Sequence, residues 1–205
     1  VLLQLSFTAF VFLGAREGDV TLAANQVLMQ FLEVTAYALD GFAFAAETLV
    51  GQAVGMRRPA GVRAATRLAL RWGLAGAVLL GLFYALLGPA LIDVMAAGGD
   101  VRDEARRFLP WLAVAPVIGV AAWTYDGVFV GATLSRDMRN LMGVATLLYA
   151  VALVILVPLH GNHGLWLALM ILNLARSLLM WWRYPRAEAR AAGPGARGKA
   201  CLRGA

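Results

Sequence analysis

The sequence contains few charged residues and almost no cysteine. Only 15% of its 205 residues are charged and 61% are hydrophobic, whereas an average soluble domain is about 25% charged. The single cysteine, Cys201, excludes a disulfide framework and a thiolate metal cluster within the chain. A soluble fold of this length could not bury so much apolar surface. The composition therefore indicates an integral membrane protein.

Sequence motifs for nucleotide hydrolysis and for common enzyme chemistry are also missing. The chain has no P-loop, no Gly-x-Ser-x-Gly motif and no His-Glu-x-x-His motif. Its two histidines, His160 and His163, lie in a short glycine-containing connection, which predicts a turn rather than a metal site. No nucleophile and base occur together at helical spacing. We therefore expect no enzyme and no cofactor, and any pumping would use a gradient of H+ or Na+.

What the sequence does contain is a series of six apolar segments. They cover residues 1–15, 22–54, 68–95, 108–133, 141–159 and 165–182. A helix needs about 20 apolar residues to cross a bilayer, so the first segment is expected to be a truncated helix. Gly88 and Pro89 predict an interruption near the end of the third segment. The pattern predicts an all-α polytopic membrane protein in which residues 1–184 form a lobe of six transmembrane helices.

Two stretches outside these segments have a different character. Residues 96–107 follow the Gly98-Gly99 pair and carry charges of both signs at helical spacing, which predicts a short amphipathic surface helix. Residues 185–205 are basic and rich in Ala and Gly, which predicts a disordered tail.

The basic residues indicate an orientation. The net charge of +6 could indicate a nucleic-acid partner, but the Lys and Arg residues lie between apolar segments and in the tail rather than on one soluble face. If the second segment ends in the cytoplasm, most of the 18 Lys and Arg residues fall in inner loops and the tail, and the 160–164 connection has none. By the positive-inside rule the C-terminus is then cytoplasmic. We expect the lipid bilayer as a partner and no nucleic acid.

Three carboxylates interrupt the second apolar segment. Glu33, Asp40 and Glu47 follow one another at intervals of seven residues, so they form a column on one helix side with a drift of about 20° per step. A carboxylate in the bilayer costs about 2.5–3.5 kcal/mol and usually faces a bundle interior or a wet cavity. The low dielectric favours the neutral acid, so Asp40 is suited to exchange a proton. The alternative is a structural hydrogen bond to another helix.

A fourth acid, Asp126, lies in the fourth segment. It is placed to meet Asp40 or Glu47 across a helix pair and form a shared site, although a hinge beside Gly127 is an alternative. We predict that Asp40, Glu47 and Asp126 couple ions or protons, and that Glu33 is solvated near the outer interface.

Aromatic and basic side chains complete the set of candidates. Tyr37, Phe44 and Trp123 offer ring faces to a cationic amphiphile, or else pack against helices and lipid. Arg176 is expected to extend toward the lipid headgroups. Gly-x-x-x-Gly motifs at residues 51–55 and 127–131 are typical of close helix packing.

Two runs of residues resemble a known family. They are Tyr37-Ala-Leu-Asp-Gly-Phe-Ala-Phe-Ala-Ala-Glu-Thr-Leu-Val-Gly-Gln-Ala-Val-Gly55 and Asp126-Gly-Val-Phe-Val-Gly-Ala-Thr-Leu-Ser-Arg-Asp-Met-Arg-Asn140. Both are similar to the C-terminal lobe of multidrug and toxin extrusion (MATE) transporters of the DinF (DNA-damage-inducible F) branch. The resemblance covers about residues 3–183.

The resemblance implies one half of a twelve-helix antiporter. Such a protein exports cationic or amphiphilic drugs and toxins in exchange for H+ or Na+, by alternating access between two six-helix lobes. The partners implied are the small-molecule substrate and a missing N-terminal lobe, and the location implied is the plasma membrane, the inner membrane of a bacterium. A lipid-linked oligosaccharide flippase of the same superfamily, which would need a cationic cavity, and a non-transporting remnant are the alternatives.

Overall fold

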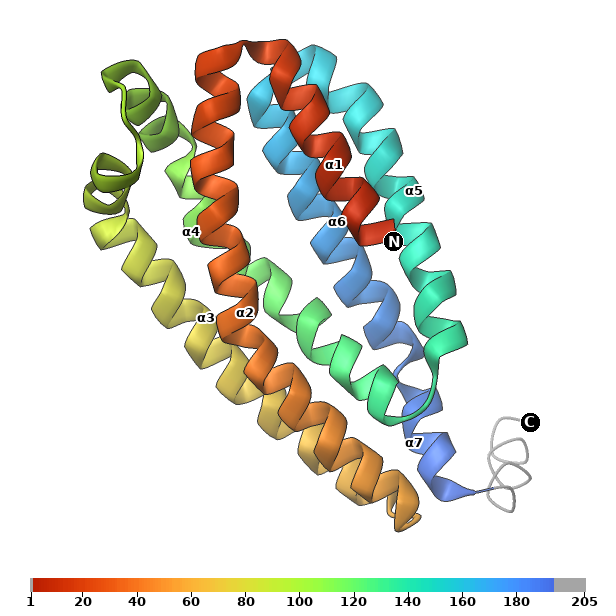
Figure 1. Cartoon of the computed structure of the whole chain (residues 1–205). Helices are drawn as coiled ribbons and strands as arrows, with labels where there is room; N and C mark the ends of the chain where they lie inside the picture. The colour runs from red at the N-terminus through yellow and green to blue at the C-terminus, as the bar shows by residue number, and fades with distance from the viewer. Residues whose placement is uncertain (1, 194–205) are drawn as a thin grey trace.

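The computed structural model describes residues 2–193, and all of its regular elements there are helical (Figure 1). In chain order they are α1 (Leu2–Gly14), the 3-10 helix η1 (Ala15–Glu17), α2 (Asp19–Gly55), α3 (Pro59–Met95), α4 (Gly99–Gly131), α5 (Ser135–His160), α6 (Asn162–Arg183) and α7 (Pro185–Ala192). Each of the six apolar segments corresponds to one of the helices α1 to α6, which confirms the predicted all-α fold.

Five of these helices are long and apolar enough to cross a membrane. The remaining apolar helix, α1, has 13 residues and is shorter than a full span. The helices α2 and α3 each have 37 residues, which corresponds to about 55 Å at 1.5 Å per residue. Because the apolar core of a bilayer is about 30 Å thick, both helices tilt or extend beyond it.

Two predicted interruptions do not occur. The charged residues 99–107 are the first turns of α4 rather than a separate surface helix, and Arg106 pairs there with Asp93 of α3 at 2.6 Å. Likewise α3 continues through Pro89. Proline within a membrane helix is tolerated because neighbouring helices compensate for the lost backbone bond. The course of α4, which contains two prolines, bends where it passes behind α2 in Figure 1.

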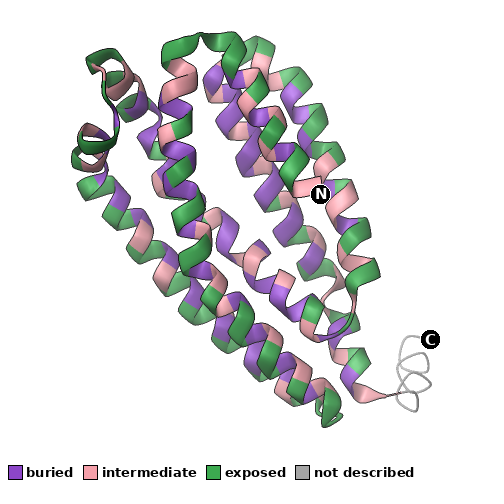
Figure 2. Cartoon of the chain, viewed as in Figure 1, coloured by how far each residue is buried: buried purple, intermediate pink, exposed green. Residues whose placement is uncertain are grey.

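The helices differ in how much of their surface is buried. The helices α4 and α6 lie in the middle of the bundle, and more than half of the residues in their most apolar stretches are buried. The helices α3 and α5 are mostly exposed (Figure 2). The exposed residues of α3 and α5 are largely apolar, for example Leu79, Leu86 and Val154. An apolar surface of this extent suits contact with lipid rather than water.

Glycines on α4 bring its backbone against α2. A Cβ atom at Gly127 would overlap the carbonyl group of Ala43, and one at Gly131 would overlap the carbonyl group of Glu47. The motif at residues 127–131 therefore does provide close packing, as predicted. The motif at 51–55 contributes less, because a Cβ at Gly51 would lie 3.7 Å from the nearest atom of α4 and one at Gly55 would meet nothing within 4 Å.

A buried amide cluster joins α2 to the start of α6. The Nδ2 atom of Asn25 donates to Oδ1 of Asn162 at 2.7 Å, and the Nδ2 atom of Asn162 donates back to Oδ1 of Asn25 at 3.1 Å. The indole Nε1 of Trp166 donates to the same oxygen at 3.0 Å.

The turn before α6 is the single residue Gly161, whose φ of 55° suits glycine. His163, in the first helical turn of α6, accepts a hydrogen bond at Nδ1 from the indole Nε1 of Trp111.

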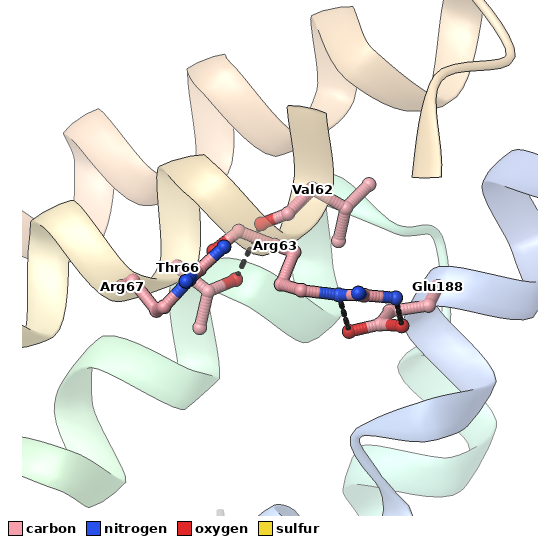
Figure 3. A network of polar contacts seen from close by, with 5 residues as sticks. All are labelled: Val62, Arg63, Thr66, Arg67 and Glu188. Carbon is pink, nitrogen blue, oxygen red and sulfur yellow. Dashed lines mark hydrogen bonds and ion pairs between the residues drawn. The ribbon is translucent and has the colours of Figure 1, made fainter. Parts of the chain in front are cut away.

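The segment after residue 184 begins with a helix, which differs from the predicted disorder. Helix α7 buries Ala187 and Ala191 against the bundle. Glu188 accepts two hydrogen bonds from Arg63 of α3, at 3.0 and 2.7 Å (Figure 3). The helix forms because these contacts offset the low apolar content of the segment. The remainder of the predicted tail, from residue 194 on, lies outside the described residues.

Candidate functional site

A cavity of about 320 Å³ lies between α1, α2, α4 and α6. Its lining residues are Leu3, Gln4 and Phe7 of α1; Met29, Leu32, Glu33, Ala36, Tyr37 and Asp40 of α2; Trp123 and Asp126 of α4; and Asn173 and Arg176 of α6. Four of its lining side chains are charged, three carboxylates and one guanidinium. Charged groups on membrane helices are costly and mark functional sites by default.

The helical period explains how each helix presents its polar groups to the cavity. On α2, Glu33, Tyr37 and Asp40 are four and three residues apart, so they lie on one face. On α4, Trp123 and Asp126 are three residues apart and also share a face. Gly127, next to Asp126, allows this part of α4 to approach α2 closely. The cavity therefore forms where these two faces meet.

Arg176 and Asp126 form an ion pair within the cavity. The guanidinium Nη2 of Arg176 lies 2.5 Å from Oδ2 of Asp126, and the exposed fractions of the two side chains are 1% and 24%. Within the described residues, Nε and Nη1 of Arg176 and Oδ1 of Asp126 are buried without a hydrogen-bond partner. The pair thus retains unused donors and an unused acceptor at a polar cavity.

The prediction that Arg176 extends to the lipid headgroups is wrong. The side chain is buried because α6 lies in the middle of the bundle and Arg176 reaches Asp126 of α4. A signal for this was present in the sequence, since Arg176 and Ser177 lie three and four residues after Asn173 and form a polar stripe with it on an otherwise apolar helix. The partner of Arg176 lies 50 residues away in the chain.

The neighbouring polar residues of α6 form their hydrogen bonds within their own helix. The amide of Asn173 donates to the carbonyl oxygen of Leu169 at 3.3 Å, and the hydroxyl of Ser177 donates to the carbonyl oxygen of Asn173 at 2.9 Å. Arg176 is therefore the residue of this stripe that reaches across to another helix.

The charge of the cavity is acidic overall. With Glu33, Asp40, Asp126 and Arg176 all ionised, the formal charge is −2. An acidic cavity of low dielectric attracts cations, and ring faces such as those of Tyr37 and Trp123 add cation–π contacts. Groups of three or more His, Cys, Asp or Glu side chains that could hold a metal ion do not occur among residues 2–193.

Four of the six predicted site residues meet at this cavity, namely Tyr37, Asp40, Trp123 and Asp126. Glu33, predicted to be merely solvated, lines the cavity as well.

Glu47 and Phe44, the other two predicted site residues, do not line this cavity in the described part of the chain. Phe44 is 65% exposed on the outside of α2. At the level of Glu47 the backbone of α2 packs against Gly131, so α4 occupies the space where a cavity would continue. The column of three acids is thus divided, with Glu33 and Asp40 at the cavity and Glu47 outside its lining in the described part of the chain.

Comparisons of sequence with known proteins give consistent results. The family model MatE matches residues 1–156. The chain is 43% identical to DNA damage-inducible protein F of Escherichia coli (strain K12) over 185 residues, which is 89% of this chain and 40% of that protein. It is 28% identical to Protein DETOXIFICATION 42 of Arabidopsis thaliana over 83% of this chain and 33% of that protein. The chain thus spans less than half the length of these relatives.

Comparison of structures supports the same fold. A crystal structure of the eukaryotic MATE transporter AtDTX14 superposes with a TM-score of 0.81 over 93% of this chain and 46% of that chain. The sequence identity of this match is 15%, so it bears on the fold alone.

Proposed function

The chain belongs to the MatE family of multi-pass membrane proteins, as the two sequence runs around Asp40 and Asp126 predicted, and we propose that it forms one lobe of an ion-coupled exporter of cationic or amphiphilic compounds. The chain matches less than half of its relatives' length, so the proposal includes a second six-helix lobe as its partner. Internal repeats with a cavity between them are a general plan for transporters.

The acidic cavity is the observation that carries this proposal. Three carboxylates from two helices share it with one guanidinium. A cavity of this charge favours cationic substrates and small cations over anions. The exposed ring of Tyr37 and the half-buried ring of Trp123 add surfaces on which a flat cationic compound can stack.

The ion pair with Arg176 distinguishes Asp126 from Asp40. Arg176 balances the charge of Asp126, so Asp126 does not need a second cation in this state. Asp40 forms no ion pair within residues 2–193 and lines the same cavity. We assign exchange of the coupling ion to Asp40, with Asp126 as the acid that becomes available when Arg176 moves away. Both H+ and Na+ suit a carboxylate in such a cavity.

A lipid-linked oligosaccharide flippase is less consistent with the cavity. Recognition of a pyrophosphate requires an excess of positive charge. Here the one guanidinium, Arg176, faces three carboxylates. A coupling role for Glu47 also lacks support from the cavity, because Glu47 is not among its lining residues in the described chain.

The same proposal places the chain in the plasma membrane with its C-terminus in the cytoplasm. The arginines of the α2–α3 turn, of the first turns of α5 and of α7 lie at one end of the bundle, and an excess of basic residues marks the cytoplasmic side. A cysteine introduced for labelling in α7 would be modified only after the membrane is permeabilised.

The proposal is tested by Asp40→Asn in the protein that carries both lobes. Removing the charge of Asp40 should abolish efflux of ethidium driven by an ion gradient, because the exchange site is lost. The matched control is Glu47→Gln, which removes a carboxylate from the same helix outside the cavity lining and should leave efflux near the wild-type rate. Unchanged efflux by the Asp40 variant at equal expression would reject the assignment.

A further inference from the structure

A second cavity, of about 490 Å³, lies at the end of the bundle that carries α7. Its lining includes Arg57 of the α2–α3 turn, Leu134 of the α4–α5 turn, and Arg186 and Arg190 of α7. No acid lines it within the described part of the chain. We propose that this cavity binds the phosphate group of an anionic membrane phospholipid.

Contacts with the bundle hold α7 and its arginines in place. Two buried alanines pack this helix against the bundle, and its two ion pairs join it to other helices. Glu188 is held by Arg63 of α3, and Arg186 lies 2.5 Å from Asp137 of α5. The helix therefore does not move freely in solvent, and its arginines have a defined location relative to the α2–α3 turn.

The cluster has more positive charge than the chain itself compensates. Arg186 and Arg190 are four residues apart on one helix, so they share a face and repel each other. Asp137 compensates Arg186, but neither Arg57 nor Arg190 forms an ion pair within residues 2–193. A phosphate group between these guanidinium groups would relieve the repulsion and accept charge-assisted hydrogen bonds from them.

The backbone conformation of Arg57 is unusual for an arginine. Arg57 has a φ of 53°, in the left-handed region where glycine is the usual residue at the end of a helix. Its backbone N–H donates to the carbonyl oxygen of Val54 at 3.0 Å, which fixes the turn. An arginine at such a position carries a conformational cost that glycine would avoid. The side chain of this residue lines the cavity.

The cavity lies at the level where lipid headgroups are expected. Trp181 and Trp182, in the last turn of α6 just before α7, are 64% and 63% exposed. Exposed tryptophans at a helix end mark the membrane interface. The exposed Met56, which lies in the chain between the lining residues Gly55 and Arg57, and the lining residue Val54 offer apolar contact to acyl chains. Basic pockets at the ends of membrane helices are suited to anionic headgroups, and a free phosphate would lack these apolar contacts.

This inference does not depend on transport, so its test needs no transport assay. The full chain in neutral detergent is titrated with phosphatidylglycerol or phosphatidylcholine, and the midpoint of thermal unfolding is measured. Phosphatidylglycerol should raise the midpoint of the wild type. In Arg57→Gln/Arg190→Gln the apparent affinity should fall by roughly tenfold or more, because two charges that contact the phosphate are lost.

The matched control is Arg58→Gln/Arg67→Gln. It removes the same charge from exposed positions in the α2–α3 turn and the first turns of α3, toward the same end of the bundle but outside the cavity lining. Its affinity for phosphatidylglycerol should stay within about twofold of the wild type, because Arg57 and Arg190 remain in the cavity and only the long-range attraction of lipid, which both variants lose equally, is weakened. Equal losses in the two variants would show general charge attraction and overturn the proposal.

Inorganic phosphate provides the second arm. A shift of the unfolding midpoint with phosphate equal to that with phosphatidylglycerol would identify a site for soluble anions and overturn the lipid assignment. No preference for phosphatidylglycerol over phosphatidylcholine would overturn it as well. If the double variant did not fold, as judged by circular dichroism, Arg57→Gln would be compared with Arg58→Gln, and equal affinities would again contradict the proposal.

Discussion

Replacing Asp126 by Asn should destabilise the chain strongly, because it leaves the charge of Arg176 buried and unbalanced. The guanidinium is 1% exposed, and two of its nitrogens already lack partners among the described residues. Removing one partner of a buried ion pair costs about 3–5 kcal/mol. Since the side chain of Asp126 is 24% exposed, we expect the lower end, about 3 kcal/mol. This corresponds to roughly a hundredfold decrease in the ratio of folded to unfolded protein.

Replacing the other partner of the ion pair, Arg176→Gln, should reduce the free energy of unfolding by less. The carboxylate left behind can take up a proton and become neutral, whereas a guanidinium stays charged at any accessible pH. The double variant Asp126→Asn/Arg176→Gln should recover most of the lost stability, to within about 1 kcal/mol of the wild type, because neither member of the pair is left charged without its partner. The two single variants and the double variant form a cycle that isolates the pair energy.

The structure offers a matched control for this cycle. Asp137 pairs with Arg186 at the same 2.5 Å, and its side chain has the same exposed fraction of 24%, but the exposed fraction of Arg186 is 54%. Solvent screens such a pair, so Asp137→Asn should cost no more than about 1 kcal/mol. Free energies of unfolding are measured by denaturant titration of the full chain in detergent. Equal effects of Asp126→Asn and Asp137→Asn would refute the reasoning from burial.

Two further predictions concern packing and are checked by thermal unfolding. Gly127→Ala should destabilise the protein by about 1–3 kcal/mol because its Cβ would overlap the carbonyl of Ala43. As a control, Gly143→Ala, whose Cβ would meet nothing within 4 Å, should be neutral or stabilise by up to about 1 kcal/mol. A Gly127→Ala variant as stable as the wild type would contradict close packing of α2 and α4. Asn25→Ala should cost about 1–3 kcal/mol because it leaves the buried amide of Asn162 without its partner. A variant as stable as the wild type would argue against a structural role of the amide cluster.

The six apolar helices, α1 to α6, and their approximate positions could be predicted from the sequence. Apolar segments of about 20 residues are required by the thickness of the bilayer, so hydropathy alone locates them. The boundaries were less accurate, because α3 and α4 continue through charged turns at residues 59–67 and 99–107. Charged residues at helical spacing support a helix as well as apolar ones do outside the bilayer core.

The candidate site could be predicted only in part. Asp40, Asp126, Tyr37 and Trp123 stood out because acids and aromatic residues are conspicuous in apolar segments, and all four line one cavity. Glu47 stood out for the same reason but lies where α2 packs against Gly131. Its position along the chain carries no information about the helix that will lie against it.

By itself, the sequence determined that the chain is a helical membrane protein with costly acids in two of its spans, because each of these features depends on local composition and period. Only the tertiary structure decided which charges meet. In a membrane helix the positions that face lipid and those that face the bundle are both apolar, so hydropathy does not distinguish them. The contact of Gly127 with α2 and the burial of Arg176 against Asp126 determine which helix faces turn toward the bundle. Both contacts join residues that are distant in the chain.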